Sequence, residues 1–245
     1  MWLLGRPESA LTDVENAIKD ARKTSHAATL LYALTCTNLT QIGRGDYEAV
    51  RAQSDEAIAL ADEKVGAPLW KAHAMIERGC LLAFTGKAAD AASVITSGLG
   101  AYRSTGTTLY VPWHLSSLAS VHVDLGQFDE AWRCIHEAMT TIETGKERVW
   151  EAEVNRVAGQ IALKSPERDS AKAEEYFERA LAVARQQQAK SWELRAAMSL
   201  ARLWRDQGKV QQARELLAPV YGWFTEGFDT RDLKDAKVLL EELAA

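Results

Sequence analysis

Apolar residues recur along this chain with the spacing of amphipathic helices, and small residues hold fixed places within that pattern. The clearest stretch opens at Gly126, which is followed by Ala131 after five residues and by Ala138 after twelve. The same arrangement follows Gly5, Gly45, Gly86 and Gly208, and a sixth copy lacks its glycine. The small positions are Ala10, Ala17, Val50, Ala57, Ala91, Gly98, Ala131, Ala138, Ala173, Ala180, Ala213 and Val220. Because the copies lie 40 to 42 residues apart, the pattern indicates a repeat protein.

Each unit is predicted to hold two helices, one before its glycine and one after it. First helices are expected at about 26–43, 68–85, 110–125, 148–164 and 190–207. Second helices are expected at about 8–24, 47–64, 88–104, 128–144, 170–188 and 210–224. A last helix, about 231–243, has an apolar stripe and a charged face, as terminal units of helical arrays do. The fold class predicted is therefore all-α, a right-handed superhelical solenoid of antiparallel helix pairs.

The units divide the chain without any linker that would separate domains. We expect one repeat domain over 1–245, made of a partial repeat, five full repeats and a capping helix. Their boundaries are 1–25, 26–66, 67–106, 107–146, 147–188, 189–228 and 229–245. Breaks between units carry turn residues, at Gly66-Ala67-Pro68, at Gly106 and at Gly145. Trp2, Leu3 and Leu4 have no partner in the pattern, which predicts that the chain belongs to a longer protein or self-associates there.

The recurring small residues have a packing reason. A residue that faces the crossing point of two helices limits how closely their backbones approach, and alanine or glycine permits axes near the lower end of the usual ~8–10 Å range. The first helices carry a matching small residue seven positions before the turn, at Gly79, Ala119 and Ala201, and at Gly159 in the unit with a longer turn. These columns are predicted to be structural.

Composition narrows the possible functions. The net charge is −5 and the pI about 5.6, with no basic stripe, so nucleic-acid binding is disfavoured. The three cysteines are scattered and show no CxxC spacing, which argues against a disulfide framework and fits a reducing compartment. No apolar run approaches the roughly 20 residues that span a bilayer. We expect a cytoplasmic protein without membrane contact.

The turn segments Gly126-Gln127-Phe128-Asp129-Glu130-Ala131 and Gly45-Asp46-Tyr47-Glu48-Ala49 resemble the turn motif of the tetratricopeptide repeat family. The period here is nearer 40 than the 34 residues usual in that family, which is similar to the long-helix variants in bacterial signalling ATPases and transcription activators. The resemblance implies a superhelix whose first helices line a concave surface.

The tail, Leu216 to Phe228, resembles the C-terminal repeat region of bacterial class III adenylate and guanylate cyclases that carry an ATPase module. The resemblance implies that this chain is the C-terminal part of a larger bacterial signalling protein. The chain has no cyclase metal carboxylates and no GxxxxGK[ST] loop, so neither activity is assigned to it. We expect no enzyme activity and no cofactor.

Two columns of the first helices are candidates for recognition. The column Thr29, Trp70, Tyr110, Trp150 and Trp192 either packs neighbouring hairpins together or forms a stacking ladder on the groove. The second column, with its polar companions, resembles the groove-facing positions of tetratricopeptide arrays. Its predicted partner-binding residues are Tyr32, His73, Trp113, Ser116, Ser120, Glu153, Arg156, Arg195 and Arg202. The alternative for this column is an ordinary solvated helix face.

The remaining polar residues give little sign of chemistry. His114 and His122 are eight positions apart on one predicted helix, and His73 with Glu77 is a single pair, whereas a zinc site needs three or four ligands. We therefore expect no metal site and no catalytic residue.

The function predicted is a regulatory scaffold that binds a peptide or a neighbouring domain on its concave face. A small-molecule sensor that gates an attached cyclase, ATPase or transcription effector is the alternative, and an enzyme with a hidden groove site is a third possibility.

Overall fold

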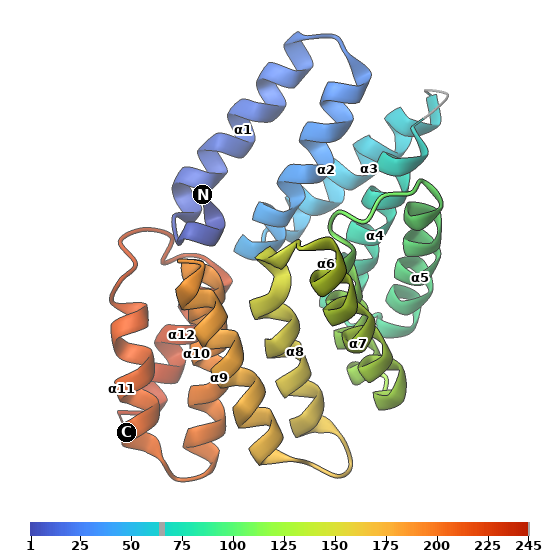
Figure 1. Cartoon of the computed structure of the whole chain (residues 1–245). Helices are drawn as coiled ribbons and strands as arrows, with labels where there is room; N and C mark the ends of the chain where they lie inside the picture. Colours follow the sequence, from blue (N-terminus) through green and yellow to red (C-terminus); the bar gives the residue numbers. More distant parts are fainter. Residues whose placement is uncertain (64–66, 245) are drawn as a thin grey trace.

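The computed structural model describes residues 1–63 and 67–244, and within them the chain is all-helical. Twelve α-helices and two short 3₁₀ helices follow one another (Figure 1). They are η1 (Trp2–Leu4), α1 (Pro7–Lys23), α2 (Ala27–Arg44), α3 (Tyr47–Glu63), α4 (Pro68–Phe84), α5 (Ala88–Ser104), α6 (Val111–Asp124), α7 (Phe128–Gly145), η2 (Arg148–Trp150), α8 (Glu151–Lys164), α9 (Ser170–Gln186), α10 (Lys190–Asp206), α11 (Val210–Tyr221) and α12 (Arg231–Glu242). None of these helices is long and apolar enough to cross a membrane.

Each predicted helix is present, and the boundaries agree to within a few residues. The helix expected at 148–164 begins with the 3₁₀ turn η2 before α8. The longer turn of that unit ends at Asp169, whose carboxylate accepts the Lys172 N–H at 2.9 Å and caps α9. The N-cap residue of α12, Thr230, makes no such side-chain cap, because its hydroxyl donates to the Gly227 carbonyl instead. The predicted end of one helix at Lys64 and the break at Gly66 lie outside the described residues.

The helices form two layers. Each first helix (α2, α4, α6, α8 and α10) packs against the second helix that follows it, and that second helix also packs against the first helix of the next unit. First helices contact one another as well, α2 with α4, α4 with α6, α6 with α8, and α8 with α10. The first helices therefore make a continuous inner layer, and the second helices form an outer one.

The small-residue columns lie mostly at helix contacts. Buried members are Ala10, Val50, Ala57, Ala91, Gly98, Ala131, Ala138, Ala173, Ala180, Ala213 and Val220. At Gly98 a Cβ atom would stand 2.8 Å from Cγ1 of Ile76 on the facing helix. Ala17 departs from the column because it is exposed. Its unit has only the three-residue η1 as a first helix, so no partner covers that face of α1.

The first and last units of the chain meet, because η1 packs against α10 and the start of α1 lies beside the turn before α12 (Figure 1). Trp2 is 5% exposed, and its ring lies 5.0 Å from that of Trp192 on α10 in an edge-to-face arrangement. The Ser191 hydroxyl donates to the Trp2 carbonyl at 2.6 Å. α12 also contacts α2. The contacts therefore close the helical array on itself, and Trp2 is not the unpartnered residue that the sequence suggests.

Candidate functional site

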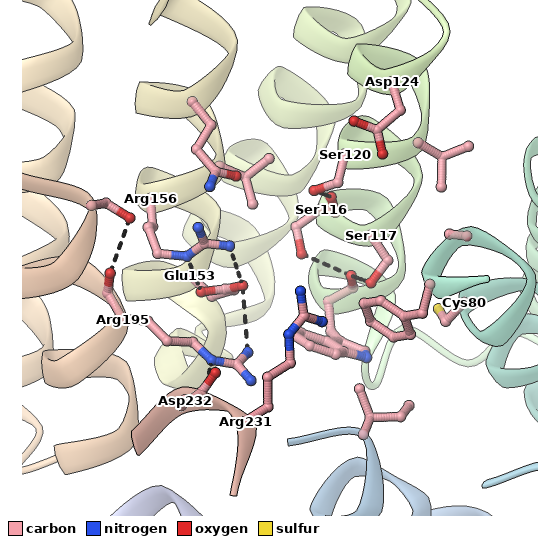
Figure 2. Close-up of a pocket in the computed structure, with 18 of the residues that line it drawn as sticks. Cys80, Ser116, Ser117, Ser120, Asp124, Glu153, Arg156, Arg195, Arg231 and Asp232 are labelled. Atoms are coloured by element: carbon pink, nitrogen blue, oxygen red, sulfur yellow. Dashed lines mark hydrogen bonds and ion pairs between the residues drawn. The ribbon is translucent and has the colours of Figure 1, made fainter. Parts of the chain in front are cut away.

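A cavity of about 280 Å³ opens on the inner layer, where the two ends of the chain meet. Helices α4, α6, α8 and α10 contribute to its wall, and so do the end of α2, the start of α3 and the start of α12 (Figure 2). Four arginines and four carboxylates line it, together with four serines. The charged residues are Asp124, Glu153, Arg156, Arg195, Arg202, Arg231, Asp232 and Asp235. We call this cavity the inner pocket.

Glu153 is the centre of an ion-pair network in the inner pocket. Its carboxylate accepts two hydrogen bonds from Arg156, at 2.7 and 2.8 Å, and lies 3.8 Å from a guanidinium nitrogen of Arg195 (Figure 2). Burial raises the pKa of Glu153, but the two arginines outweigh burial and hold that pKa below its usual value. Glu153 therefore carries a paired negative charge at neutral pH.

Arg195 connects α8, α10 and α12. Its Nε donates to Asp232 at 2.6 Å, and its guanidinium lies 5.0 Å from the ring centre of Trp2 and 5.2 Å from that of Trp192. Burial lowers the pKa of Arg195, whereas Asp232 and Glu153 raise it, and the net shift is upward. The carboxylates that pair with Arg195 are therefore supplied by the chain itself.

Arg231 closes the opposite side of the inner pocket. It donates to the Tyr47 hydroxyl at 2.6 Å, lies 3.8 Å from the Asp235 carboxylate and stands over the ring of Phe84. Arg202 differs from the other three arginines, because no carboxylate of the described part of the chain is within 4.0 Å of it. Burial lowers its pKa further than nearby Asp235 can restore it.

Hydroxyl groups of α6 face the arginines across the inner pocket (Figure 2). Ser116 and Ser117 donate to the Trp113 carbonyl at 2.8 and 3.0 Å, and Ser120 donates to the Ser116 carbonyl at 3.1 Å. Since each hydroxyl hydrogen is used within the helix, the oxygen lone pairs remain available as acceptors. One wall of the pocket thus offers acceptors, and the other offers guanidinium donors.

The structure brings seven of the nine predicted partner-binding residues to this one pocket. They are Trp113, Ser116, Ser120, Glu153, Arg156, Arg195 and Arg202. Tyr32 and His73 are not among them: Tyr32 is 57% exposed and packs edge-to-face on Trp70, and His73 is buried.

A groove-facing position implies that Trp113 and Arg195 are largely exposed, and that expectation is wrong. Trp113 is 8% exposed, and the Arg195 side chain is 16% exposed. Trp113 is buried because other aromatic rings cover it: its ring centre lies 5.4 Å from that of Trp150 and 5.8 Å from that of Trp192. Arg195 is covered because α12 and Trp2 pack over it. Both still border the inner pocket through part of their surface.

Trp150 and Trp192, the last two members of the aromatic column, pack neighbouring hairpins together, which is one of its two predicted roles. Trp150 and Trp192 are 2% and 1% exposed, and both belong to the aromatic cluster that holds Trp2 and Trp113. Trp192 also donates its indole N–H to the Val149 carbonyl of the preceding unit at 3.2 Å. These rings join neighbouring hairpins and leave no face free for stacking.

A second polar cluster lies in the core beside the inner pocket. His73 and His114 have ring centres 5.1 Å apart, and Glu77 accepts a hydrogen bond from Asn38 at 2.8 Å. Burial lowers the pKa of His73 to about 4 and that of His114 well below its usual value, while burial raises the pKa of Glu77. Among the described residues, no three His, Cys, Asp or Glu side chains are arranged to hold a metal.

Among the pocket residues that the sequence did not indicate are two aromatic residues and three charged residues of α12. Tyr47 and Phe84 stack with ring centres 4.8 Å apart, and Arg231, Asp232 and Asp235 lie on the polar face of α12. The sequence signal for the three α12 residues is the half-polar character of the last helix, and that signal does not say which surface the polar face meets.

Among solved structures, the chain is similar to BtubC (BKLC) from P. vanneervenii, with a TM-score of 0.60 and 17% sequence identity. The match covers 97% of this chain and 89% of that one. At this identity the likeness shows a shared helical fold alone. No protein-family model matches the chain, and no curated protein matches it.

Proposed function

We propose that the chain is a tetratricopeptide-like, right-handed superhelical domain that binds a short segment of a protein partner in its inner pocket, without catalysing a reaction. One observation carries this proposal: residues from three successive first helices, α6, α8 and α10, chosen by their repeat position, converge on one cavity. The period of about 40 residues and the two helical layers support the tetratricopeptide-like architecture. The resemblance of the tail, Leu216 to Phe228, supports a regulatory role within a bacterial cytoplasmic signalling protein.

The size of the inner pocket, about 280 Å³, suits the side chains of one or two residues. A peptide or a neighbouring domain that inserts such a segment would fit it. Because the lining combines arginines, carboxylates and hydroxyls, those side chains are expected to be polar.

The same size favours a second candidate, a sensor of small molecules. Ligand pockets usually begin at about 300 Å³. A ligand of the size of an amino acid or a single sugar would fill most of the inner pocket. In that role the domain would gate an attached effector instead of holding a partner.

A pair of tryptophan substitutions separates pocket binding from binding elsewhere. Ser120→Trp fills the inner pocket, and Thr96→Trp places the same side chain on the exposed outer face of α5. Peptides selected from a displayed random library against the whole chain should bind Ser120→Trp at least tenfold more weakly, and Thr96→Trp with unchanged affinity. Equal binding to both variants would overturn the proposal.

A thermal-shift screen against common metabolites tests the sensor. A metabolite that raises the melting temperature of the wild type and of Thr96→Trp, but not of Ser120→Trp, would favour the sensor over the peptide-binding scaffold. Circular dichroism of both variants checks that they fold.

A further inference from the structure

The contact between the chain ends is built around a tryptophan wedge. Trp2 projects from η1 into a notch on α2 at Gly43, where any Cβ atom would collide with the indole ring. The opposite side of the wedge meets Trp192 and Arg195 of α10. Trp2 therefore joins the first unit to the fifth through its side chain, and Gly43 makes room for it.

A reciprocal pair of caps reinforces this wedge. The Glu226 carboxylate accepts the backbone N–H groups of Glu8 and Ser9, both at 3.0 Å, and the Ser9 hydroxyl at 3.1 Å. In return, the Glu8 carboxylate accepts the Gly227 N–H at 2.8 Å. A carboxylate from the turn before α12 thus satisfies free N–H groups at the start of α1, where the helix dipole also favours negative charge.

These contacts hold one wall of the inner pocket in place. Arg44 at the end of α2 donates to the Pro7 carbonyl at 2.8 Å and lies 3.9 Å from the Asp229 carboxylate. A few residues further on, Arg231 reaches across to the Tyr47 hydroxyl and to Phe84. Tyr47 and Phe84 belong to the first units, and Arg231 belongs to α12. If the ends separate, the wall of the inner pocket divides between Arg231 on one side and Tyr47 and Phe84 on the other.

We propose that the end-to-end contact is a latch, formed by Trp2, Glu8, Ser9, Glu226 and Gly227, that opens as a unit and controls entry to the inner pocket. In repeat arrays each unit depends on its immediate neighbours for stability. Opening the latch breaks contacts between units that are not neighbours and leaves the neighbour packing intact. Such a contact can open at a lower free energy than the whole array. The open form exposes the concave face to ligands larger than the closed pocket admits.

The latch contacts can open and close without any ligand. Their role in controlling the entry of a ligand rests on the proposed function of the inner pocket. The two failures can be told apart. A latch that opens in a protein whose inner pocket binds nothing would remove the proposed function alone. Ligand binding with no opening would remove the latch alone.

Cys80 reports on the opening. It lines the inner pocket, is 4% exposed, and burial raises the pKa of its thiol to about 12, so it reacts slowly in the closed form. Cys36→Ser and Cys134→Ala leave it as the single cysteine. In that background, Trp2→Ala should speed the reaction with N-ethylmaleimide at least tenfold. The rate should be insensitive to low urea concentrations, since a local opening exposes little surface.

The matched control is Trp132→Ala, which removes a half-buried tryptophan packed against Tyr176, away from the latch. Its reaction rate should rise less than threefold. Glu226→Gln tests the caps without removing the wedge and should speed the reaction in the same direction, with its helix content unchanged by circular dichroism. Equal rates in Trp2→Ala and Trp132→Ala, or rates in Trp2→Ala and Glu226→Gln that match their parent, would overturn the latch. Reaction only upon global unfolding, seen as a steep urea dependence, would overturn it too.

Discussion

Replacing Gly159 with alanine tests the repeat packing at a close crossing of two helices. Gly159 lies within α8, where that helix crosses α9, and an added Cβ would stand 2.5 Å from Cε1 and 2.6 Å from Cδ1 of Phe177. Phe177 is 1% exposed, so its ring has no free space to move into. The substitution therefore forces α8 and α9 apart or drives Phe177 out of its preferred rotamer.

The magnitude follows from two opposing effects. Alanine favours the helix over glycine by about 1 kcal/mol. Overpacking a filled contact costs about 1–3 kcal/mol. Gly100→Ala supplies the first effect without the second, because Gly100 is exposed on α5 and a Cβ there meets nothing within 4 Å. Gly159→Ala should thus be less stable than Gly100→Ala by about 1–3 kcal/mol, which is a few degrees in melting temperature for a chain of this size.

Urea denaturation followed by circular dichroism measures both variants. The double variant Gly159→Ala, Phe177→Leu should lose less than the sum of its single changes, because a smaller side chain at 177 gives the new methyl group room. If Gly159→Ala gained as much stability as Gly100→Ala, or if the two changes were strictly additive, the close crossing of α8 and α9 would be refuted.

Two further predictions concern buried charge. Since the pKa of His73 falls from 6.5 to about 4 on folding, the unfolded chain takes up its proton first, and the His73 contribution lowers the free energy of unfolding as pH falls from 6.5 to about 4, by up to about 3 kcal/mol. Glu77, whose pKa is raised by burial, acts in the opposite direction, so the His73 contribution is read from a variant. Urea titrations across this pH range should show a smaller decline in His73→Gln, and an identical slope would contradict the assignment. Arg195→Ala leaves Glu153 and Asp232 with fewer partners and should cost about 3 kcal/mol. Arg205→Ala, which removes a partly exposed arginine paired with Glu242, should cost under about 1 kcal/mol, and equal losses would show that burial does not matter here.

The helices could be predicted from the sequence because their signals are local. Gly159 and Phe177 lie within one helix pair, and Gly79 with Ile95 makes the corresponding contact in another unit. Chain order alone therefore specifies which helix meets which. The burial of Trp113 could not be predicted, because it depends on aromatic rings from other units. The neighbours of Trp113 on its own helix, such as Ser116 and Ser120, are polar and give no sign of those rings.

Closure of the array could not be predicted in this way. Trp2 meets Trp192 across most of the length of the chain, and this contact depends on how every intervening pair of helices packs. No local pattern in the sequence specifies the sum of those packing angles. Arg231 shows the same limit, since its contacts with Tyr47 and Phe84 join α12 to units that are distant in the sequence.

The packing around Arg195 bears on what the inner pocket recognises under the proposed function. Its repeat position alone predicts an arginine that faces the groove and is free to bind a partner. In the structure its guanidinium already has two carboxylates and two indole rings around it. Opening the ends would remove only Trp2 from this set, because Glu153 lies on α8 and Asp232 on α12, and both helices contact α10. A polar ligand of the inner pocket would therefore bind the groups that remain available, Arg202 and the hydroxyls of α6.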